Sequence, residues 1–358
     1  MDPVTHMLTG ACLSRAGLNR KTALATLTLT LALEAPDIDS LYYFGGPITG
    51  LQHHRGITHS LFGAPFMAAA VVALVYLLNR WIIARQRSRN GNRSGTFPKL
   101  PPNWKLLYGY AVLGSLVHLF QDFTNNYGVR PFAPFNEKWY AWDIVFIVDP
   151  IMLLALFLAL VVPALMALIT EEIGSRKPQF RGRGAAIFAL ICLAAVILVR
   201  DFEHRRAVNA LNARTYRGED PVRASAFPQP INPFSWSGVV ETQDFFQLAP
   251  IDSGSGEIDP LNISIVRFKP EETPVTLAAK KSRMGRVYLD WARYPLLTVE
   301  KLEGGRYQAQ FEDLRFESAE SIAQHRAPVL AGYVVLDPQL RVEEMFTGRP
   351  PQAVPNRK

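Results

Sequence analysis

Hydrophobic residues gather in the first 200 positions of this 358-residue chain, in runs long enough to cross a membrane. A helix needs about 20 mostly apolar residues to span a bilayer. Four segments approach or exceed that length: 60–80, 106–122, 144–169 and 185–200. Two shorter apolar segments, 5–17 and 22–35, precede them and predict a tight hairpin of short, tilted helices. The pattern therefore predicts an α-helical membrane bundle of about six helices.

The pattern changes after residue 200, where polar residues become frequent. Residues 201–235 begin with a predicted helix, Asp201–Arg214, and continue as a Pro-rich linker. From residue 236 the hydrophobic residues alternate with polar ones, as they do in β-strands. The predicted strands are Val239–Leu248, Ile263–Phe268, Tyr307–Phe316 and Val329–Leu336. We expect a membrane domain over 1–200, a helix and linker over 201–235, and a small, mainly antiparallel β (α+β) domain over 236–358.

Basic residues are distributed unevenly among the loops of the membrane domain. Loops 15–21, 80–105 and 171–184 carry three, seven and four Lys or Arg residues, whereas 36–59 and 123–143 together carry three. Short loops rich in Lys and Arg stay in the cytoplasm. With six crossings, the N-terminus, both histidine clusters described below and the C-terminal domain would lie outside the cytoplasm. The net charge is +7, and many of the basic residues lie in these short loops, where they set the orientation in the membrane. We therefore do not expect a nucleic-acid partner.

Three smaller features complete the outline. Cys12 and Cys192 each lie inside an apolar segment, which predicts small core residues and neither a disulfide nor a Cys-based zinc site. The N-terminal residues lack the basic region of a cleavable signal peptide. The polar stretch 86–103 predicts a flexible linker by its composition.

Three of the seven histidines fall within seven residues, in His53-His54-Arg55-Gly56-Ile57-Thr58-His59, directly before the apolar segment 60–80. Ionisable groups are costly in or near hydrocarbon, so membrane proteins keep them mainly for function. His54 and His59 are candidate metal ligands near the positive end of the following helix. His53 is either a third ligand or a surface residue.

A second polar pair closes the segment 106–122. His118 and Asp122 are four residues apart on a predicted helix and therefore share one face. An imidazole and a carboxylate in that arrangement can ligate one divalent cation. The alternative is a hydrogen-bonded pair that tethers neighbouring helices.

Further His and Asp residues recur on the same predicted side. Asp37 and Asp39 follow the second helix and are either ligands or part of a helix cap or solvated turn. His6 begins the first helix, and the hairpin places it on this side too. Asp143 and Asp149 flank the entry to the fifth helix, where an N-cap at Asp143 and a helix break or kink at Asp149-Pro150 are the stronger interpretations.

The candidate ligands are all His or Asp: His6, Asp37, Asp39, His54, His59, His118 and Asp122. Such a set suits zinc, manganese or iron(II), and zinc is favoured for hydrolysis. Asp39 and Asp122 are the carboxylates expected to act as general base or to orient ligand imidazoles. Arg55 suits an anionic substrate, or else it contacts a lipid headgroup or pairs with Asp37 or Asp39. His204 and His325 lie in polar surroundings and are poor candidates.

The chain resembles the YdjM family of inner-membrane metal-dependent hydrolases. The matching pieces are Met-Asp-Pro-Val-Thr-His-Met-Leu-Thr-Gly at residues 1–10, Pro-Asp-Ile-Asp at 36–39, His-His-Arg-Gly-Ile-Thr-His-Ser at 53–60 and His-Leu-Phe-Gln-Asp-Phe-Thr-Asn at 118–125. The resemblance implies a bacterial inner-membrane protein with metal-dependent hydrolase activity. It also implies a distant similarity to the zinc-dependent phospholipase C and single-strand nuclease superfamily, whose members hold a zinc cluster. Because this chain lacks their further downstream histidines, we expect one or two ions. His6, Asp37 or Asp39, His54 or His59, His118 and Asp122 would fill the ligand roles in chain order.

Two functional hypotheses follow. The first is a membrane hydrolase acting on a phosphate ester or diphosphate of a lipid at the extracytoplasmic interface, so that its partners are membrane lipid and an anionic, lipid-like substrate. The second is a non-catalytic membrane protein in which a metal or an ion-pair network joins the helices and the outer domain binds a protein partner. A transporter is less favoured, because paired, Gly/Pro-broken helices are missing from the sequence pattern.

Overall fold

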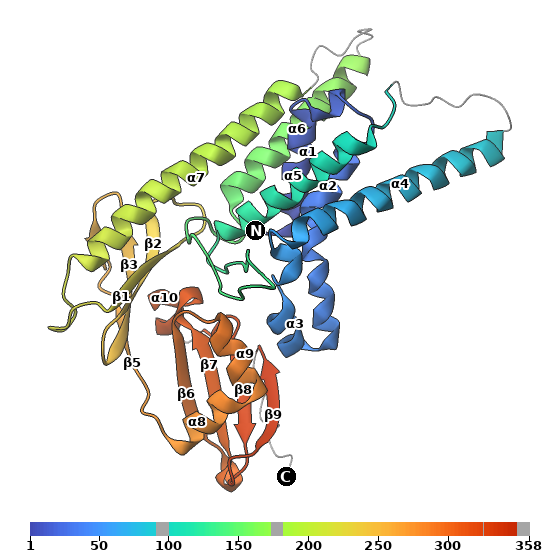
Figure 1. Cartoon of the computed structure of the whole chain (residues 1–358). Helices are drawn as coiled ribbons and strands as arrows, with labels where there is room; N and C mark the ends of the chain where they lie inside the picture. Colours follow the sequence, from blue (N-terminus) through green and yellow to red (C-terminus); the bar gives the residue numbers. More distant parts are fainter. Residues whose placement is uncertain (91–99, 173–181, 325, 349–358) are drawn as a thin grey trace. The chain divides into compact units, whose positions relative to one another are not determined.

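The computed structural model describes residues 1–90, 100–172, 182–324 and 326–348 (Figure 1). These residues form two compact units. The first contains Met1–Asp39 and Arg55–Arg200, and the second contains Ser40–His54 together with the chain from Asp201 onward. The segment 40–54, which the sequence assigned to the membrane domain, thus belongs to the same unit as the C-terminal domain.

The first unit is helical, as the apolar segments predicted. Its helices are α1 (Pro3–Arg15), α2 (Ala25–Glu34), α4 (Gly63–Asn90), α5 (Trp104–Phe123), α6 (Pro150–Glu172) and the first part of α7 (Arg183–Asn212). Short 3-10 helices η1 (Leu18–Arg20), η2 (Ala35–Gly45) and η3 (Ile57–His59) lie between them. The segment 185–200 and the separate helix expected over 201–214 are one continuous helix, α7.

Three of these helices are long and apolar enough to cross a membrane: Gly63–Gln86, Pro150–Ile169 and Arg183–Asn212. The expectation of about six membrane helices is therefore wrong for the described residues. Helix α1 has 13 residues and α2 has 10, which at 1.5 Å per residue is well short of the roughly 30 Å hydrocarbon core. Helix α5 has 20 residues, but Lys105, His118, Gln121 and Asp122 reduce its hydropathy. Because the sidedness argument counted six crossings, the extracytoplasmic location of the C-terminal domain stays a prediction.

Close contacts with two glycines hold α2 between α1 and α5. A Cβ atom at Gly10 would lie 2.8 Å from the Leu29 carbonyl oxygen, and one at Gly114 would lie 2.8 Å from the Cβ of Ala32. Small residues at such positions let helix backbones approach closely. The packing brings the C-terminal ends of α2 and α5 and the first turn of α1 to the same place.

The second unit contains two antiparallel sheets. The first joins β1 (Arg223–Pro228), β2 (Ser235–Glu241), β3 (Phe245–Asp252) and β4 (Glu257–Ile258) in that order, with β5 (Ile265–Phe268) also paired to β3. The second has the order β6 (Pro295–Lys301), β7 (Tyr307–Asp313), β8 (Gly332–Leu336) and β9 (Val342–Thr347). Helices α8 (Pro274–Lys281), α9 (Arg283–Trp291) and α10 (Ala319–Ala323) and the 3-10 turns η4 (Glu303–Gly305) and η5 (Leu314–Phe316) complete it.

Buried side chains join the two sheets into one core. Phe227, Val239 and Phe246 of the first sheet pack with Tyr294 and Leu296 at the start of the second. On its other side, the first sheet is covered by the end of α7, through Ala207 and Leu211 among others. The C-terminal antiparallel β domain is therefore confirmed.

The strand boundaries differ from the predicted ones in informative ways. The predicted strand Val239–Leu248 is two strands, because the Thr242 backbone and side chain both pair with Phe245 and close a tight turn between β2 and β3. Strand β1 lies within the segment predicted as a Pro-rich linker. A proline is tolerated there because β1 is an edge strand, in which Pro228 is the last residue and pairs with Trp236. Part of the predicted linker 86–103, part of the loop 171–184, and His325 lie outside the described residues.

The segment 40–54 carries the short helix α3 (Pro47–His53), which packs against α9 and β9 of the second unit. The guanidinium of Arg283 donates to the Thr49 hydroxyl at 3.1 Å and to the Gln52 side-chain oxygen at 3.2 Å. Gly50 lies flat against the ring of Tyr43, at a distance that leaves no room for a Cβ atom. The chain thus leaves the first unit after Asp39, forms this segment of the second unit, and re-enters the first unit at Arg55.

We predict that Gly10→Ala lowers the stability of the protein by about 1–3 kcal/mol, because the added methyl group would overpack the α1–α2 contact. Gly109→Ala is the matched control: it is also helical, but nothing lies within 4 Å of its Cβ position. That change should be neutral or slightly stabilising. The midpoints of thermal unfolding in detergent measure both effects, and equal midpoints for the two variants would contradict the predicted contact.

Candidate metal centre

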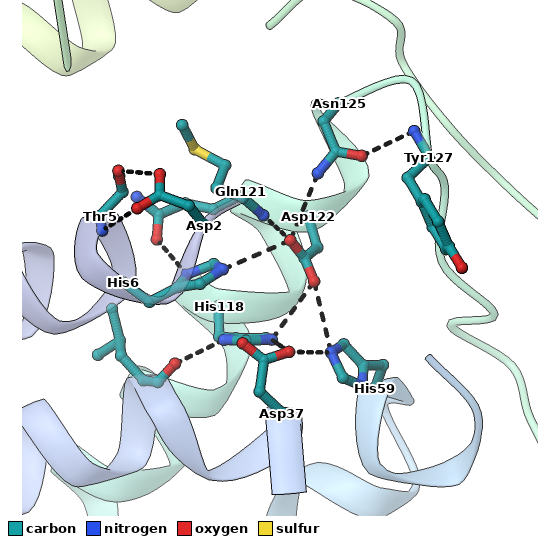
Figure 2. A network of polar contacts seen from close by, with 12 residues as sticks. Asp2, Thr5, His6, Asp37, His59, His118, Gln121, Asp122, Asn125 and Tyr127 are labelled. Atoms are coloured by element: carbon teal, nitrogen blue, oxygen red, sulfur yellow. Dashed lines mark hydrogen bonds and ion pairs between the residues drawn. The ribbon is translucent and has the colours of Figure 1, made fainter. Parts of the chain in front are cut away.

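Four elements bring His and Asp side chains to one buried place in the first unit. His6 comes from the first turns of α1, Asp37 from η2, His59 from η3, and His118 and Asp122 from one face of α5. Figure 2 shows the five side chains pointing toward one another. One ligand atom each from Asp37, His59, His118 and Asp122 lies within 4.8 Å of the others.

The spacing of these atoms suits a single metal ion. The Asp122 Oδ2 atom lies 3.4 Å from both His59 Nε2 and His118 Nε2. The Asp37 Oδ1 atom lies 3.2 Å from His59 Nε2 and 3.8 Å from His118 Nε2. A tetrahedron with metal–ligand bonds near 2.1 Å has edges of about 3.4 Å. The four residues therefore stand about as far apart as the ligands of one tetrahedral zinc ion do.

Several atoms of the cluster are buried without a hydrogen-bond partner. They are His6 Nε2, His118 Nε2 and Asp122 Oδ2, and their side chains have no exposed surface. Buried polar atoms are normally paired, and an unpaired one costs about 1–3 kcal/mol. Because these atoms face the same place, the donor set fits a divalent cation, which would satisfy several of them at once.

Hydrogen bonds fix the orientation of two imidazoles. His118 Nδ1 lies 2.5 Å from the Leu33 carbonyl oxygen, and His6 Nδ1 lies 2.9 Å from the Gln121 side-chain oxygen. The carbonyl oxygens accept, so the Nδ1 atoms carry the protons and each Nε2 atom has a free lone pair directed at the cluster. Gln121 is itself held by the Thr9 hydroxyl at 3.0 Å. The rings of His6 and His118 stack with their centroids 3.9 Å apart.

His59 is oriented by Asp39. The Asp39 Oδ2 atom lies 2.9 Å from His59 Nδ1 and also accepts from the Arg55 backbone N–H and the Thr58 hydroxyl, both at 2.8 Å. A carboxylate in this place holds the tautomer and direction of a ligand imidazole. The structure therefore places Asp39 behind His59, as a positioning residue, and places Asp37 in the group of ligand atoms.

Arg55 donates hydrogen bonds to Asp122 and to residues next to it. Its Nη2 donates to Asp122 Oδ1 at 3.0 Å, and its Nη1 donates to the Asn125 side-chain oxygen at 3.2 Å and the Gly128 carbonyl at 3.0 Å. The guanidinium also stacks on the Tyr127 ring, 4.7 Å from its centroid. The Met1 amino group contacts Asp122 Oδ1 as well. Both terminal nitrogens of Arg55 are thus engaged within the protein, and the argument from Arg55 to an anionic substrate is not supported by its geometry.

The protonation states that burial favours are those that a metal needs. Burial, with a smaller contribution from nearby positive charge, lowers the pKa of His6 and of His118 well below the ordinary value, so both imidazoles are neutral. Burial works to raise the pKa of Asp37, but the hydrogen bond from His59 and nearby positive charge, including that of Arg55, outweigh it and hold that pKa at about 2. Neutral imidazole and ionised carboxylate are the forms that bind divalent cations.

The structure leaves the other predicted residues outside this cluster. His54 and His53 lie in the second unit, against Tyr43 and Tyr42. Asp149 caps α6 through the backbone N–H groups of Ile151 and Met152, and its carboxylate pairs with Arg200 at 2.9 Å with both side chains fully buried. Asp143 is buried in a left-handed backbone conformation and is not among the four grouped residues. His204 contacts the Trp236 ring in the second unit.

Sequence reasoning missed the supporting residues Gln121, Asn125 and Glu34. Gln121 and Asn125 do carry a recognisable signal, because both lie within one helical turn of Asp122. Glu34 is the last residue of α2, three positions before Asp37. Burial, with the charges of Asp37 and Asp2, raises its pKa to about 7. The sequence offered no sign that this glutamate would be half-buried near two other carboxylates.

Comparison with known proteins supports the conclusion that the chain is a membrane protein. The sequence profile of the YdjM inner membrane protein family matches residues 1–206, which include every residue of the cluster. The chain belongs to this family. The three candidate membrane spans agree with membership of the YdjM family of inner membrane proteins. The chain is also 24% identical over 330 residues to the uncharacterized protein YfhP of Bacillus subtilis (strain 168), covering 89% of this chain and 88% of that protein. No solved structure matches the chain.

We predict that the YdjM-family protein, exposed to zinc and then dialysed, retains about one ion per chain, as a four-ligand site requires. His118→Ala and Asp122→Asn should abolish retention. Asp39→Asn should weaken zinc binding by about 10–100-fold, because it removes the group that orients His59. His53→Ala, at an exposed position, is the control. Elemental analysis of the purified proteins provides the measurement, and zinc retention unchanged in His118→Ala would contradict the site.

A second prediction concerns Glu34 in the metal-free protein. Its pKa is raised from 4.5 to about 7 in the folded state, so the folded state disfavours the ionised carboxylate. The free energy of unfolding should therefore decrease as the pH rises through this range. Glu34→Gln should reduce that decrease, and Glu271→Gln, at an exposed position, should leave it unchanged. Thermal midpoints at pH 5 and pH 8 in the presence of a chelator test this, and identical pH profiles for wild type and Glu34→Gln would refute it.

Proposed function

We propose that this protein is a membrane-bound metal-dependent hydrolase whose metal is held by Asp37, His59, His118 and Asp122, with His6 against it. The observation that carries the proposal is the convergence of ligand atoms from η2, η3 and α5 at the spacing of one tetrahedral ion, where His118 Nε2 and Asp122 Oδ2 are buried without a hydrogen-bond partner. Zinc is the favoured ion, because catalytic zinc sites are built from imidazole and carboxylate ligands, and zinc can expand to five ligands and so admit a water beside these four residues.

When bound, such a metal lowers the pKa of a water ligand toward about 7 and polarises a carbonyl or phosphoryl oxygen. The chain's own residues have distinct tasks. Asp39, Gln121 and the Leu33 carbonyl hold the imidazoles of His59, His6 and His118 in their binding tautomers. Arg55 neutralises and orients Asp122 through its Oδ1 atom, which leaves Oδ2 for the ion.

The exposure of the cluster side chains indicates that substrate approaches the metal next to Asp37. Its side chain is 17% exposed, whereas the other cluster side chains are 0% exposed. Asp37 is therefore the ligand that solvent reaches. Glu34, three residues earlier in the chain, has a pKa of about 7, in the range where a general base works best.

We place the substrate at the membrane interface. His59 lies four residues before the candidate span Gly63–Gln86, so the cluster stands at one end of that span. A lipid ester, and in particular a phosphate ester or diphosphate of a lipid, is the substrate class that matches this depth and a metal that activates phosphoryl groups. The extracytoplasmic side remains part of this proposal.

The test is phosphate release from phosphatidic acid and from a lipid diphosphate in phosphatidylcholine vesicles, with zinc-loaded protein. Wild type should release phosphate, and His59→Ala and His118→Ala should fall to the rate of the metal-free protein. His53→Ala should keep wild-type activity, since this residue lies outside the cluster. Full turnover by either cluster variant would overturn the proposal.

The burial of the cluster also favours a second candidate, a structural metal that joins α1, α5 and the segments between them. In that case the site has no open coordination position. X-ray absorption spectra of the zinc-loaded protein discriminate the two: a light-atom ligand replaced on addition of phosphate supports the hydrolase, and an unchanged coordination shell with loss of thermal stability on chelation supports the structural role.

A further inference from the structure

Beside the metal cluster, the first unit has an apolar groove of about 380 Å³. One wall is the face of α5 that carries Leu116, Leu119, Phe120 and Phe123, and the other is the loop 129–140 with Leu61 at its rim. These α5 residues are spaced as i, i+3, i+4 and i+7, so they form one continuous stripe. The volume lies in the range of small-molecule binding sites.

Backbone hydrogen bonds hold the groove in shape. The Leu61 N–H donates to the Pro131 carbonyl at 2.9 Å, which joins the segment after His59 to the loop. Val129 and Tyr140 exchange two backbone bonds of 2.8 Å across the loop, and the Trp142 N–H donates to the Phe123 carbonyl at 2.7 Å. A pocket whose walls are fixed in this way binds its ligand without paying for an ordering step.

The rim of the groove is strongly apolar and exposed. Leu61, Phe120 and Phe132 are 49%, 45% and 47% exposed. Next to them, Phe62 contacts both Phe66 and Phe135, with centroid distances of 5.2 and 5.4 Å, and Phe135 is 80% exposed. A contiguous apolar surface of this kind marks a site of interaction with a membrane or another molecule.

The position of the groove indicates which ligand it meets. Leu61 lies two residues before Gly63, the first residue of a candidate membrane span, and Phe66 lies in the first turn of that span. The groove therefore stands at one end of a membrane-crossing helix, where hydrocarbon chains begin beneath the lipid headgroups. Bilayer lipid is the apolar partner that is present there at high concentration.

We propose that this groove holds a hydrocarbon chain of a bilayer lipid. The chain lies along the α5 stripe and is covered at its side by the loop 129–140, with the lipid headgroup at the level of the metal cluster. His118 and Asp122 each precede a groove residue by one position, which is about 100° around the helix. Groove and cluster thus occupy the same level of α5 on different faces. That the held lipid is the substrate rests on the proposed hydrolase function; the binding of its chain does not.

The experiment uses the full chain in dodecyl maltoside micelles with a phospholipid that carries a photoactivatable diazirine near the end of one acyl chain. After illumination, mass spectrometry locates the labelled residues. Labelling of 116–123 and 129–140 should fall about tenfold or more when unlabelled phospholipid is added in large excess, as mass action requires of a saturable site. Labelling of Leu154 and Phe157, which are also exposed and lie on the candidate span Pro150–Ile169, should fall far less.

A pair of variants on α5 gives the matched control. Leu116→Trp fills the groove and should remove the competable labelling. Leu113→Trp should keep it, because Leu113 is equally exposed, at 40% against 38% for Leu116, and lies outside the groove. Groove labelling that resists competition, or that survives Leu116→Trp, would show adventitious detergent-like contact and overturn the proposal.

Asp122→Asn separates this inference from the proposed function. The variant is expected to lose its metal, and it should nonetheless keep the competable groove labelling. Such a result supports the groove even where phosphate release has failed. Loss of labelling in Asp122→Asn with an unchanged circular dichroism spectrum would place the lipid at the cluster, and the groove proposal would then be wrong.

Discussion

The carboxylate of Asp122 is the group on which the first unit is organised. An ionised carboxylate without exposed surface carries a desolvation cost of several kcal/mol unless charges and hydrogen bonds compensate it. Its two oxygens are compensated differently. Oδ1 receives Arg55, Asn125 and the Met1 amino group, whereas Oδ2 faces the Nε2 atoms of His59 and His118. The neutral imidazole of His118 compensates a carboxylate poorly, and a cation at Oδ2 would supply there the positive charge that Arg55 supplies at Oδ1.

This requirement explains the arrangement of the surrounding helices. The glycines at positions 10 and 114 let α1, α2 and α5 approach closely, and the approach brings the Leu33 carbonyl within reach of His118. The excursion 40–54 begins directly after Asp39 and ends directly before Arg55. It packs on α9 and β9 within the second unit, so the chain passes from one unit to the other directly next to Asp39 and again directly next to Arg55.

The sequence predicted the residues of the cluster better than it predicted their roles. Helical spacing was enough to pair His118 with Asp122, because a four-residue interval fixes a shared face. The choice between His54 and His59, and between Asp37 and Asp39, was not decidable from spacing, since these residues lie in irregular segments whose side-chain directions depend on tertiary contacts. Arg55 was misleading for a related reason: its partners, Asn125 and the Gly128 carbonyl, lie 70 or more positions away in the chain.

The six helices were foreseeable from apolar runs, but the number of membrane crossings depended on helix length, which the breaks after Arg15 and at Pro36 determine.

The reassignment of Arg55 changes what recognition at this site requires. A guanidinium that is 4% exposed and bonded to Asp122, Asn125 and Gly128 would have to abandon a buried carboxylate to bind an anion, at a cost of several kcal/mol. Selectivity by charge at Arg55 is therefore unfavourable. Apolar contact carries no such cost, since burying a methylene group contributes about 0.8 kcal/mol and the groove along α5 already presents an apolar stripe at the level of the cluster. For the hydrolase and the lipid groove proposed above, recognition of a substrate by its hydrocarbon chain is the arrangement that leaves the Asp122–Arg55 pair intact.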